Sequence, residues 1–208
     1  MDTQNGAVMG LANDGWQPRR VHSDADRERI REFYQRTMGD PTGWDVLTRE
    51  QDRQLGLPSG HLVAEDENGT LAGCIYFSAD PEDVLDWRSR GEDELADTIA
   101  SDVMMIHQMA VAQPHRRKGL GTALLLGARD AALGAGAALM LLALDDTQDG
   151  LADFYDENNY VVVPRGRNIA VTFHSFQAAA VRFPQSVPSH RWAYQVLSSR
   201  RVAVDEIA

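Results

Sequence analysis

The stretch from Val103 to Leu144 constrains the fold of this chain more than any other part of the sequence. It begins with an apolar, strand-like run that ends at Val111, and a polar turn and an Ala/Leu-rich helix over Leu120–Leu133 follow. Ala138–Leu144 is then an unbroken apolar run of strand length, which is typical of a strand buried on both faces. Strands that alternate with helices in this way predict an α/β fold around one sheet.

The turn before the helix has the features of a phosphate-binding site. Arg116, Arg117 and Lys118 supply positive charge, and the glycines at 119 and 121 let the backbone approach an anion closely. The start of a helix leaves several backbone N–H groups unpaired at the positive end of the helix dipole. The backbone and the basic side chains together would therefore bind a phosphate group.

Two common phosphate-binding motifs do not fit this turn. Residue 124 is Leu, so the two glycines do not begin a G-x-G-x-x-G motif, and the Gly-Lys-Ser/Thr of a P-loop is absent. The turn instead resembles the Arg/Gln-x-x-Gly-x-Gly/Ala signature of the GNAT acetyltransferases, which Arg116, Gly119 and Gly121 match. The apolar strand directly before the signature and Pro114 within the turn also fit that family.

A second element resembles the same family. Phe154-Tyr155, followed by Asn159-Tyr160, is similar to its Phe-Tyr…Gly-Phe element. Asn159 stands where the family usually has Gly, and Asn tolerates the left-handed conformation that such a position needs. Gln148 and Leu151 stand where the family often has Asn and Ala, so the match has two further departures.

The resemblance covers about residues 103 to 163 and implies a GNAT fold of the α/β (α+β) class. A mixed central sheet of about six to seven strands would be flanked by about four helices, with the fourth and fifth strands splayed apart to hold acetyl-CoA. The order of the upstream elements fits this layout. The sequence patterns predict strands over 17–21, 61–65, 71–77, 103–111, 138–144 and 160–163, helices over about 23–37, 45–55, 120–133 and 151–157, and a helix within the acidic connection 78–102.

A chain of 208 residues suits one sizeable domain. We expect a disordered leader over residues 1–15, which are rich in Gly, Asn and Asp, and an acetyltransferase domain over 16–175. Residues 176–208 should form a C-terminal extension that packs on the same domain and could complete the sheet. Asn168–Phe173 and Trp192–Leu197 are both strand-like, and the sequence does not decide which of them joins the sheet.

The composition of the chain limits the classes of molecule that it is expected to bind. The formal net charge of −11 disfavours nucleic acid, which is bound by clustered Lys and Arg, whereas it serves solubility or favours cationic molecules. No run approaches the roughly 20 apolar residues of a membrane span, and the first residues lack a signal-peptide core. We therefore expect no membrane partner and a cytoplasmic location. A homodimer is possible, with the tail from His174 to Ala208 packed across a two-fold axis.

The resemblance also implies the acetyl-CoA site. The N–H of Met109 would face the thioester oxygen, Val111 would pair with the amides of the pantetheine arm, and the amides of residues 117–122 would hold the pyrophosphate. The residues expected to contact acetyl-CoA are Met109, Ala110, Val111, Arg116, Arg117, Lys118, Gly119, Leu120, Gly121, Thr122 and Gln148. The histidines show no metal-ligand spacing, so no metal is expected.

Three catalytic contributions are expected, from Tyr155, His107 and the N–H of Met109. Tyr155 matches the general acid that protonates the leaving CoA thiolate in this family. His107 matches the histidine base of the arylalkylamine acetyltransferases, and strict alternation would place it on the same face of the strand as Met109 and Val111. A chain of water molecules could serve as the base instead, since a lone strand histidine is more often structural. Met105 stands where histone-type members carry a glutamate base.

Three aspartates and the single cysteine could have either a catalytic or a structural role. Asp145, Asp146 and Asp149 follow a predicted strand and could bind an amine, although a solvated loop and a helix cap are the more common use of such residues. Cys74 is the only cysteine, and without an adjacent base an acyl-cysteine intermediate is not expected.

These patterns predict an acetyl-CoA-dependent N-acetyltransferase. The acceptor would be the primary amine of a small cationic or aromatic molecule, such as an antibiotic, a polyamine or an amino-acid-like compound, which attacks acetyl-CoA directly in a ternary complex. Acetylation of a protein N-terminus or lysine, and a non-catalytic module that binds acyl-CoA, are the alternatives.

Overall fold

A computed structural model describes residues 15–21, 23–39, 56–176, 180–184 and 187–208 of the chain. The helix predicted over 45–55 and the predicted leader, apart from Gly15, lie outside the described residues. In the part that the structure describes, no helix is both long and apolar enough to cross a membrane.

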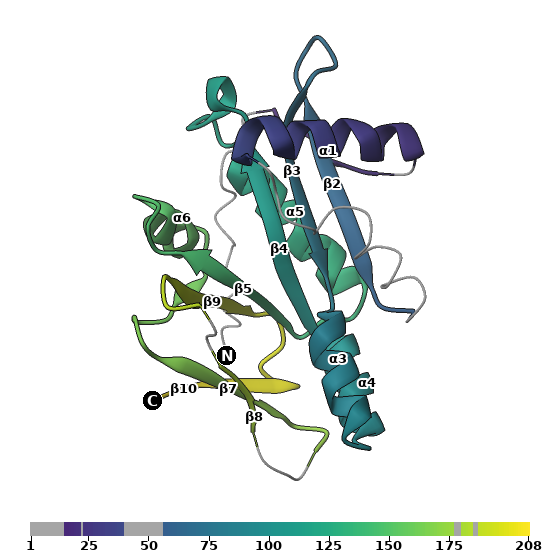
Figure 1. Cartoon of the computed structure of the whole chain (residues 1–208), viewed down its shortest axis with the longest axis vertical. Coiled ribbons are helices and arrows are strands. Elements are labelled where there is room, and N and C mark those ends of the chain that lie inside the picture. Colours follow the sequence, from purple (N-terminus) through teal and green to yellow (C-terminus); the bar gives the residue numbers. More distant parts are fainter. Residues whose placement is uncertain (1–14, 22, 40–55, 177–179, 185–186) are drawn as a thin grey trace, which may run out of the picture.

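The described residues form a seven-stranded mixed sheet, a three-stranded sheet and five α-helices, which confirms the predicted fold class (Figure 1). The strands of the large sheet lie in the order β1 (Arg19–Arg20), β2 (Ser59–Glu65), β3 (Leu71–Ser78), β4 (Val103–Val111), β5 (Leu139–Asp145), β9 (His190–Val196) and β6 (Val161–Val162). The small sheet has the order β10 (Val202–Ile207), β7 (Asn168–Phe173) and β8 (Val181–Phe183). The helices are α1 (Asp24–Met38), α3 (Pro81–Ser89), α4 (Asp93–Asp102), α5 (Leu120–Gly134) and α6 (Leu151–Glu157).

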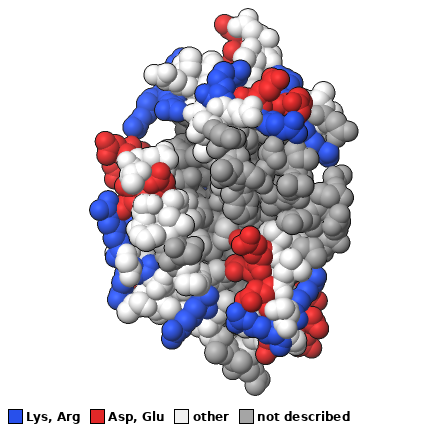
Figure 2. All heavy atoms as spheres, viewed as in Figure 1, with Lys and Arg blue, Asp and Glu red and all other residues white. Residues whose placement is uncertain are grey.

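Helices cover both faces of the large sheet. α5 packs against one face through its apolar side, and the shared core includes Leu62, Phe77, Ile106, Leu120, Leu124 and Ala128. α1 crosses the other face, where its Ile30, Phe33 and Tyr34 contact Val63, Cys74 and Ala110 (Figure 1). The acidic connection carries two helices instead of the single helix expected, α3 and α4, and the left-handed Gly91 lies between them. Acidic and basic side chains are interspersed over these two helices (Figure 2).

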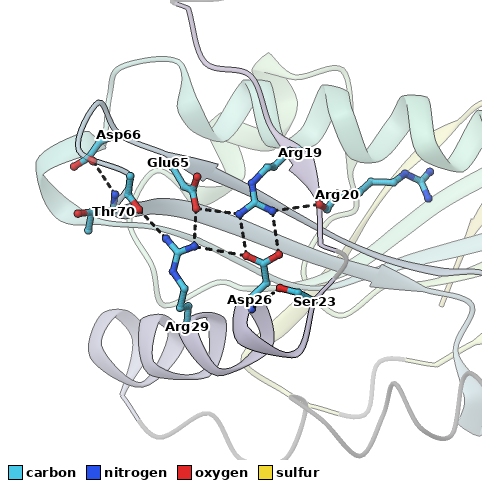
Figure 3. Close-up of polar contacts among 9 residues, drawn as sticks. Arg19, Arg20, Ser23, Asp26, Arg29, Glu65, Asp66 and Thr70 are labelled. Carbon is cyan, nitrogen blue, oxygen red and sulfur yellow. Dashed lines mark hydrogen bonds and ion pairs between the residues drawn. The ribbon is translucent and has the colours of Figure 1, made fainter.

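Strand β1 is linked to its neighbours by a network of ion pairs (Figure 3). The Arg19 guanidinium binds Asp26 of α1 at 2.9 Å and Glu65 of β2 at 3.0 Å. Arg29 of α1 binds the same Glu65 at 2.8 Å and donates to the Gly69 carbonyl in the turn between β2 and β3 at 2.7 Å. The network therefore joins β1, α1 and the β2–β3 hairpin.

β4 and β5 separate along their length. They pair in parallel only from Val103–Leu139 to Met105–Leu141, and the described part of β5 does not pair with β4 beyond that point. The two strands then diverge, as Figure 1 shows. The predicted burial of β5 on both faces holds as far as Leu142, but Ala143 lies beyond the divergence and is exposed.

β9, not β7, continues the large sheet, and the burial patterns give the reason. Trp192 and Ala193 of β9 are adjacent and both buried, 7% and 0% exposed, because their side chains enter the cores on opposite faces of the sheet. β7 buries Ile169, Val171 and Phe173 in a single core and forms the middle of the small sheet instead.

Candidate active site

The basic turn after β4 has the backbone geometry of an anion-binding site. Arg117 and Gly119 both have left-handed backbones, with φ of 59° and 71°, and alternation of such residues with right-handed ones makes successive N–H groups converge. Gly119 is the N-cap of α5, and no side chain forms a cap hydrogen bond there. Among the described residues, the N–H groups of residues 117–122 have no backbone acceptor, so they are available to an anion.

A cavity of about 710 Å³ lies between this turn, the end of β4 and the start of α6. Nine of the predicted cofactor contacts line it, namely Met109, Ala110, Val111, Arg116, Arg117, Gly119, Gly121, Thr122 and Gln148. The other two do not: Leu120 is buried in the core beneath α5, and the Lys118 side chain is exposed outside the cavity lining. Thr37, Met38, Asp149, Gly150, Leu151, Phe154 and Glu157 complete the lining.

Gly121 allows α5 and α6 to approach each other at the cavity. A Cβ atom at this position would lie 3.0 Å from Cζ of Phe154, which is closer than side chains tolerate without a shift. Arg117 also reaches toward α6, since its Nη2 lies 3.4 Å from the place that a Cβ of Gly150 would take. The second glycine of the motif therefore has a packing role in addition to the close backbone approach expected from the sequence.

The divergence of the strands exposes the edge of β4 to the cavity. Residues 106–111 have no partner strand on the β5 side within the described chain, and Met109, Ala110 and Val111 line the cavity. An extended backbone with an unpaired edge can bind amide groups of a ligand as an added strand would.

Tyr155 lies in an aromatic cluster beside the cavity. Its side chain is 5% exposed, and its ring contacts those of Phe154 and Tyr160 with centroids 5.2 and 5.5 Å apart. Burial raises the pKa of its phenol, so the hydroxyl keeps its proton at neutral pH. No partner for this hydroxyl is found among the described side chains, whereas the Tyr160 hydroxyl donates to Sδ of Met140 at 3.6 Å.

His107 is not on the face of β4 that the alternation predicted. Tyr76 of β3 pairs with Gln108 and Phe77 pairs with Ile106, so His107 is the extra residue of a β-bulge. The bulge reverses the alternation, because Met109 and Val111 pack toward the core beneath α5 while the His107 ring stacks on Tyr76. The expectation of a shared face was therefore wrong.

His107 belongs to a row of polar aromatic side chains across three strands. Its ring lies 5.2 Å from that of Tyr76, which in turn stacks on His61 at 4.4 Å. Nε2 of His107 lies 2.9 Å from Oγ of Ser78, and the Tyr76 hydroxyl donates to the same Oγ at 3.3 Å. Burial lowers the pKa of His107 to about 4, so the imidazole is neutral at pH 7.

Comparison with known proteins identifies the family. The model of the acetyltransferase (GNAT) family matches residues 20–160. The chain belongs to this family. Two motifs predicted the membership from the sequence, and the match extends upstream of them to the first strand of this GNAT domain.

Solved acetyltransferases share the fold of this GNAT chain. A phosphinothricin acetyltransferase from Sinorhizobium meliloti in complex with acetyl-CoA is 17% identical, with a TM-score of 0.57 over 88% of each chain. A GNAT-family acetyltransferase from Staphylococcus aureus is 13% identical, with a TM-score of 0.55 over 88% of this chain and all of that one (100%). A Gcn5-related N-acetyltransferase from Kribbella flavida is 20% identical, with a TM-score of 0.51 over 88% of this chain and 98% of that one. No curated protein sequence matches the chain.

The aspartates after β5 differ in their contacts. Asp145 accepts hydrogen bonds from the backbone and the hydroxyl of Thr147, and Asp146 forms ion pairs with Arg165 and Arg191. Asp149 lines the cavity. Asp145 and Asp146 are thus engaged in hydrogen bonds and ion pairs, whereas the helix cap expected in this loop is absent, because Gly150 is the N-cap of α6 and makes no side-chain cap hydrogen bond.

Sequence reasoning missed the contribution of α1 to the cavity. Thr37 and Met38 form the last turn of α1 and line the cavity, and Met38 is 50% exposed. The sequence carries no signal for this contact, because α1 lies far from the motifs along the chain. Among the described residues, no group of three or more His, Cys, Asp or Glu side chains is placed to hold a metal ion.

Proposed function

We propose that this GNAT acetyltransferase transfers the acetyl group of acetyl-CoA to the primary amine of a small cationic or aromatic molecule. One observation carries the proposal: a single cavity joins the unpaired edge of β4 to the convergent N–H groups of residues 117–122. The edge suits the amides of a pantetheine arm, and the turn suits a pyrophosphate. The residues present therefore fit the pantetheine arm and the pyrophosphate of acetyl-CoA.

Met109 and Tyr155 would stabilise the two charges that develop during transfer. The N–H of Met109, at the unpaired edge, would donate to the thioester oxygen as the amine attacks the carbonyl carbon. The C–S bond then breaks, and the buried, protonated phenol of Tyr155 would give its proton to the thiolate.

The amine must lose a proton, since an alkylamine with a pKa near 10.4 is almost wholly protonated at pH 7. His107 is neutral at pH 7 and would be the protein's candidate base, but its pKa of about 4 makes it a weak one; its bond to Ser78 would fix the orientation of its ring. Its position on the other face from the Met109 side chain does not oppose this role, because Met109 would act through its backbone. A chain of water molecules remains the alternative base.

Direct attack is favoured over an acyl-cysteine intermediate. Cys74 is fully buried (0% exposed), and burial raises the pKa of its thiol to about 12. The reactive thiolate is therefore scarce at neutral pH. Met105, where histone-type members carry a glutamate base, is buried in a core cluster, which supports a small amine over a protein lysine as the acceptor.

Calorimetric titration with acetyl-CoA, followed by turnover on a panel of free amines and of N-terminal and lysine peptides, tests the proposal. We expect saturable binding of acetyl-CoA and release of CoA with small amines. Absence of binding to the folded chain would refute the cofactor site. Turnover confined to peptides would refute the small acceptor and favour protein acetylation.

A further inference from the structure

Trp16 contacts the back of the phosphate-binding turn from a distant part of the sequence. Its indole Nε1 donates to the carbonyl oxygen of Lys118 at 3.0 Å, across 102 residues. Its ring meets that of His115 edge to face, with centroids 5.5 Å apart and planes at 84°. Trp16 packs against the core beneath α5 and does not line the cavity, so it contacts the turn from outside the cavity lining.

His115 gives the turn a second support. Its Nε2 lies 3.8 Å from Oδ2 of Asp66, at the end of β2. Asp66 also accepts hydrogen bonds from the N–H groups of Asn68 and Thr70, both at 2.9 Å, and this orders the β2–β3 hairpin. The ion-pair network of Figure 3 fixes the same hairpin to α1. The turn therefore contacts a hairpin that is itself fixed to α1.

The bond from Trp16 determines the orientation of one peptide group. The described chain contains no cis peptide, and in a trans peptide the C=O of one residue and the N–H of the next point in opposite directions. A Lys118 carbonyl that faces Trp16 therefore directs the Gly119 N–H away from Trp16. Gly119 lines the cavity, so an N–H directed away from Trp16 would be available to an anion bound there.

We propose that Trp16 is a positioning residue for acetyl-CoA, which orients the Lys118–Gly119 peptide so that the Gly119 N–H binds the pyrophosphate. This inference rests on the proposed function, because it requires that the turn binds the phosphates of CoA. Without the indole donor the peptide is free to rotate, since glycine tolerates either orientation. The N–H would then be lost to the phosphate for part of the time, while the thioester end of the site would be unchanged.

The test compares two acyl donors in the full chain. Trp16→Phe keeps an aromatic ring against His115 but removes the N–H donor. The donors are acetyl-CoA and acetyl-pantetheine, which carries the same thioester but no pyrophosphate. Trp192→Phe is the matched control, because the Trp192 indole also donates to a backbone carbonyl, that of Phe183 at 2.9 Å, in the core remote from the cavity.

We expect Trp16→Phe to raise the KM for acetyl-CoA by about fivefold, the size of one neutral hydrogen bond, with kcat unchanged. The rate with acetyl-pantetheine should be unaffected, and Trp192→Phe should leave the KM for acetyl-CoA unchanged. An unchanged KM in Trp16→Phe, or an equal loss with both donors, would overturn the positioning role while leaving the proposed function intact. A wild-type chain that does not bind CoA would overturn both.

Discussion

Tyr155 and Tyr160 have similar surroundings, but we expect only Tyr155 to act as the general acid. Both are buried and their rings are in contact, but the Tyr160 hydroxyl is engaged with Met140. We expect Tyr155→Phe to lower kcat by on the order of 100-fold, the usual contribution of a general acid, with little change in the KM for acetyl-CoA. Steady-state kinetics of Tyr155→Phe and Tyr160→Phe would check this. Equal rates in the two variants would argue against Tyr155 as the acid.

His107 predicts a pH dependence of stability. Burial lowers its pKa from 6.5 to about 4, so the unfolded chain binds a proton at this residue at a higher pH than the folded chain does. The contribution of His107 to the free energy of unfolding is therefore fully present above pH 6.5 and is lost as the pH falls toward 4.

The variant His107→Asn lacks this titration. We expect the free energy of unfolding of the wild type to decline more steeply than that of the variant between pH 6.5 and pH 4. Urea denaturation at several pH values measures both curves. A constant difference between them across this window would mean that His107 does not titrate as its burial implies.

At the scale of elements, the turn and the start of α5 act as one unit. Gly119 has a left-handed backbone and lines the cavity, so a large side chain there is both strained and obstructive. We expect Gly119→Trp to abolish measurable binding of acetyl-CoA in calorimetry. Gly134→Ala, in open space at the other end of α5, is the matched control and should bind normally. Retained binding in Gly119→Trp would place the phosphates elsewhere.

The bulge in β4 shows how one element sets the orientation of its neighbours. Strict alternation from Ile106 through His107 would point Gln108 and Ala110 toward α5, whereas Ala110 in fact packs against α1. Even-numbered Ile106 before the bulge and odd-numbered Met109 after it therefore face α5. Sequence alternation alone assigns these faces wrongly.

For the molecule as a whole, a buried carboxylate joins the C-terminal part to the centre of the fold. Asp102, 3% exposed at the end of α4, is bound by Arg201, which also donates to the carbonyl of Gly136 after α5. Loss of Arg201 would leave the buried charge of Asp102 with the Ser101 hydroxyl as its remaining side-chain donor among the described residues.

We expect Arg201→Ala to lower the free energy of unfolding by about 1–3 kcal/mol, less than for a fully buried pair because the arginine is partly exposed. Arg200→Ala, its exposed neighbour, should change it by less than about 0.5 kcal/mol. Chemical denaturation of the two variants provides the measurement. Equal midpoints would show that the contact does not contribute to stability.

The homodimer expected from the sequence stays a prediction. The tail supplies β9 to the large sheet, so deletion of residues 174–208 would disrupt the fold and could not test the dimer cleanly. The mass of the full-length chain in solution is the direct measurement.

Much of the site could be predicted from the sequence by itself, because its central features are local. A phosphate-binding turn requires glycines, basic residues and a helix start within a few positions, and residues 116–122 provide all three. The strand and helix patterns of residues 103–157 also depend on near neighbours, and the structure has these elements close to their predicted bounds.

The tertiary structure alone decided the features that depend on strand pairing and on burial. The bulge at His107 arises from the register between β3 and β4, and β9 joins the sheet because cores on both faces accept its side chains. The contact of Trp16 with Lys118 and the place of Met38 in the cavity join residues far apart in the sequence. Local sequence patterns do not predict such contacts, because the free energy of these contacts comes from burying surfaces that meet only when the chain has folded.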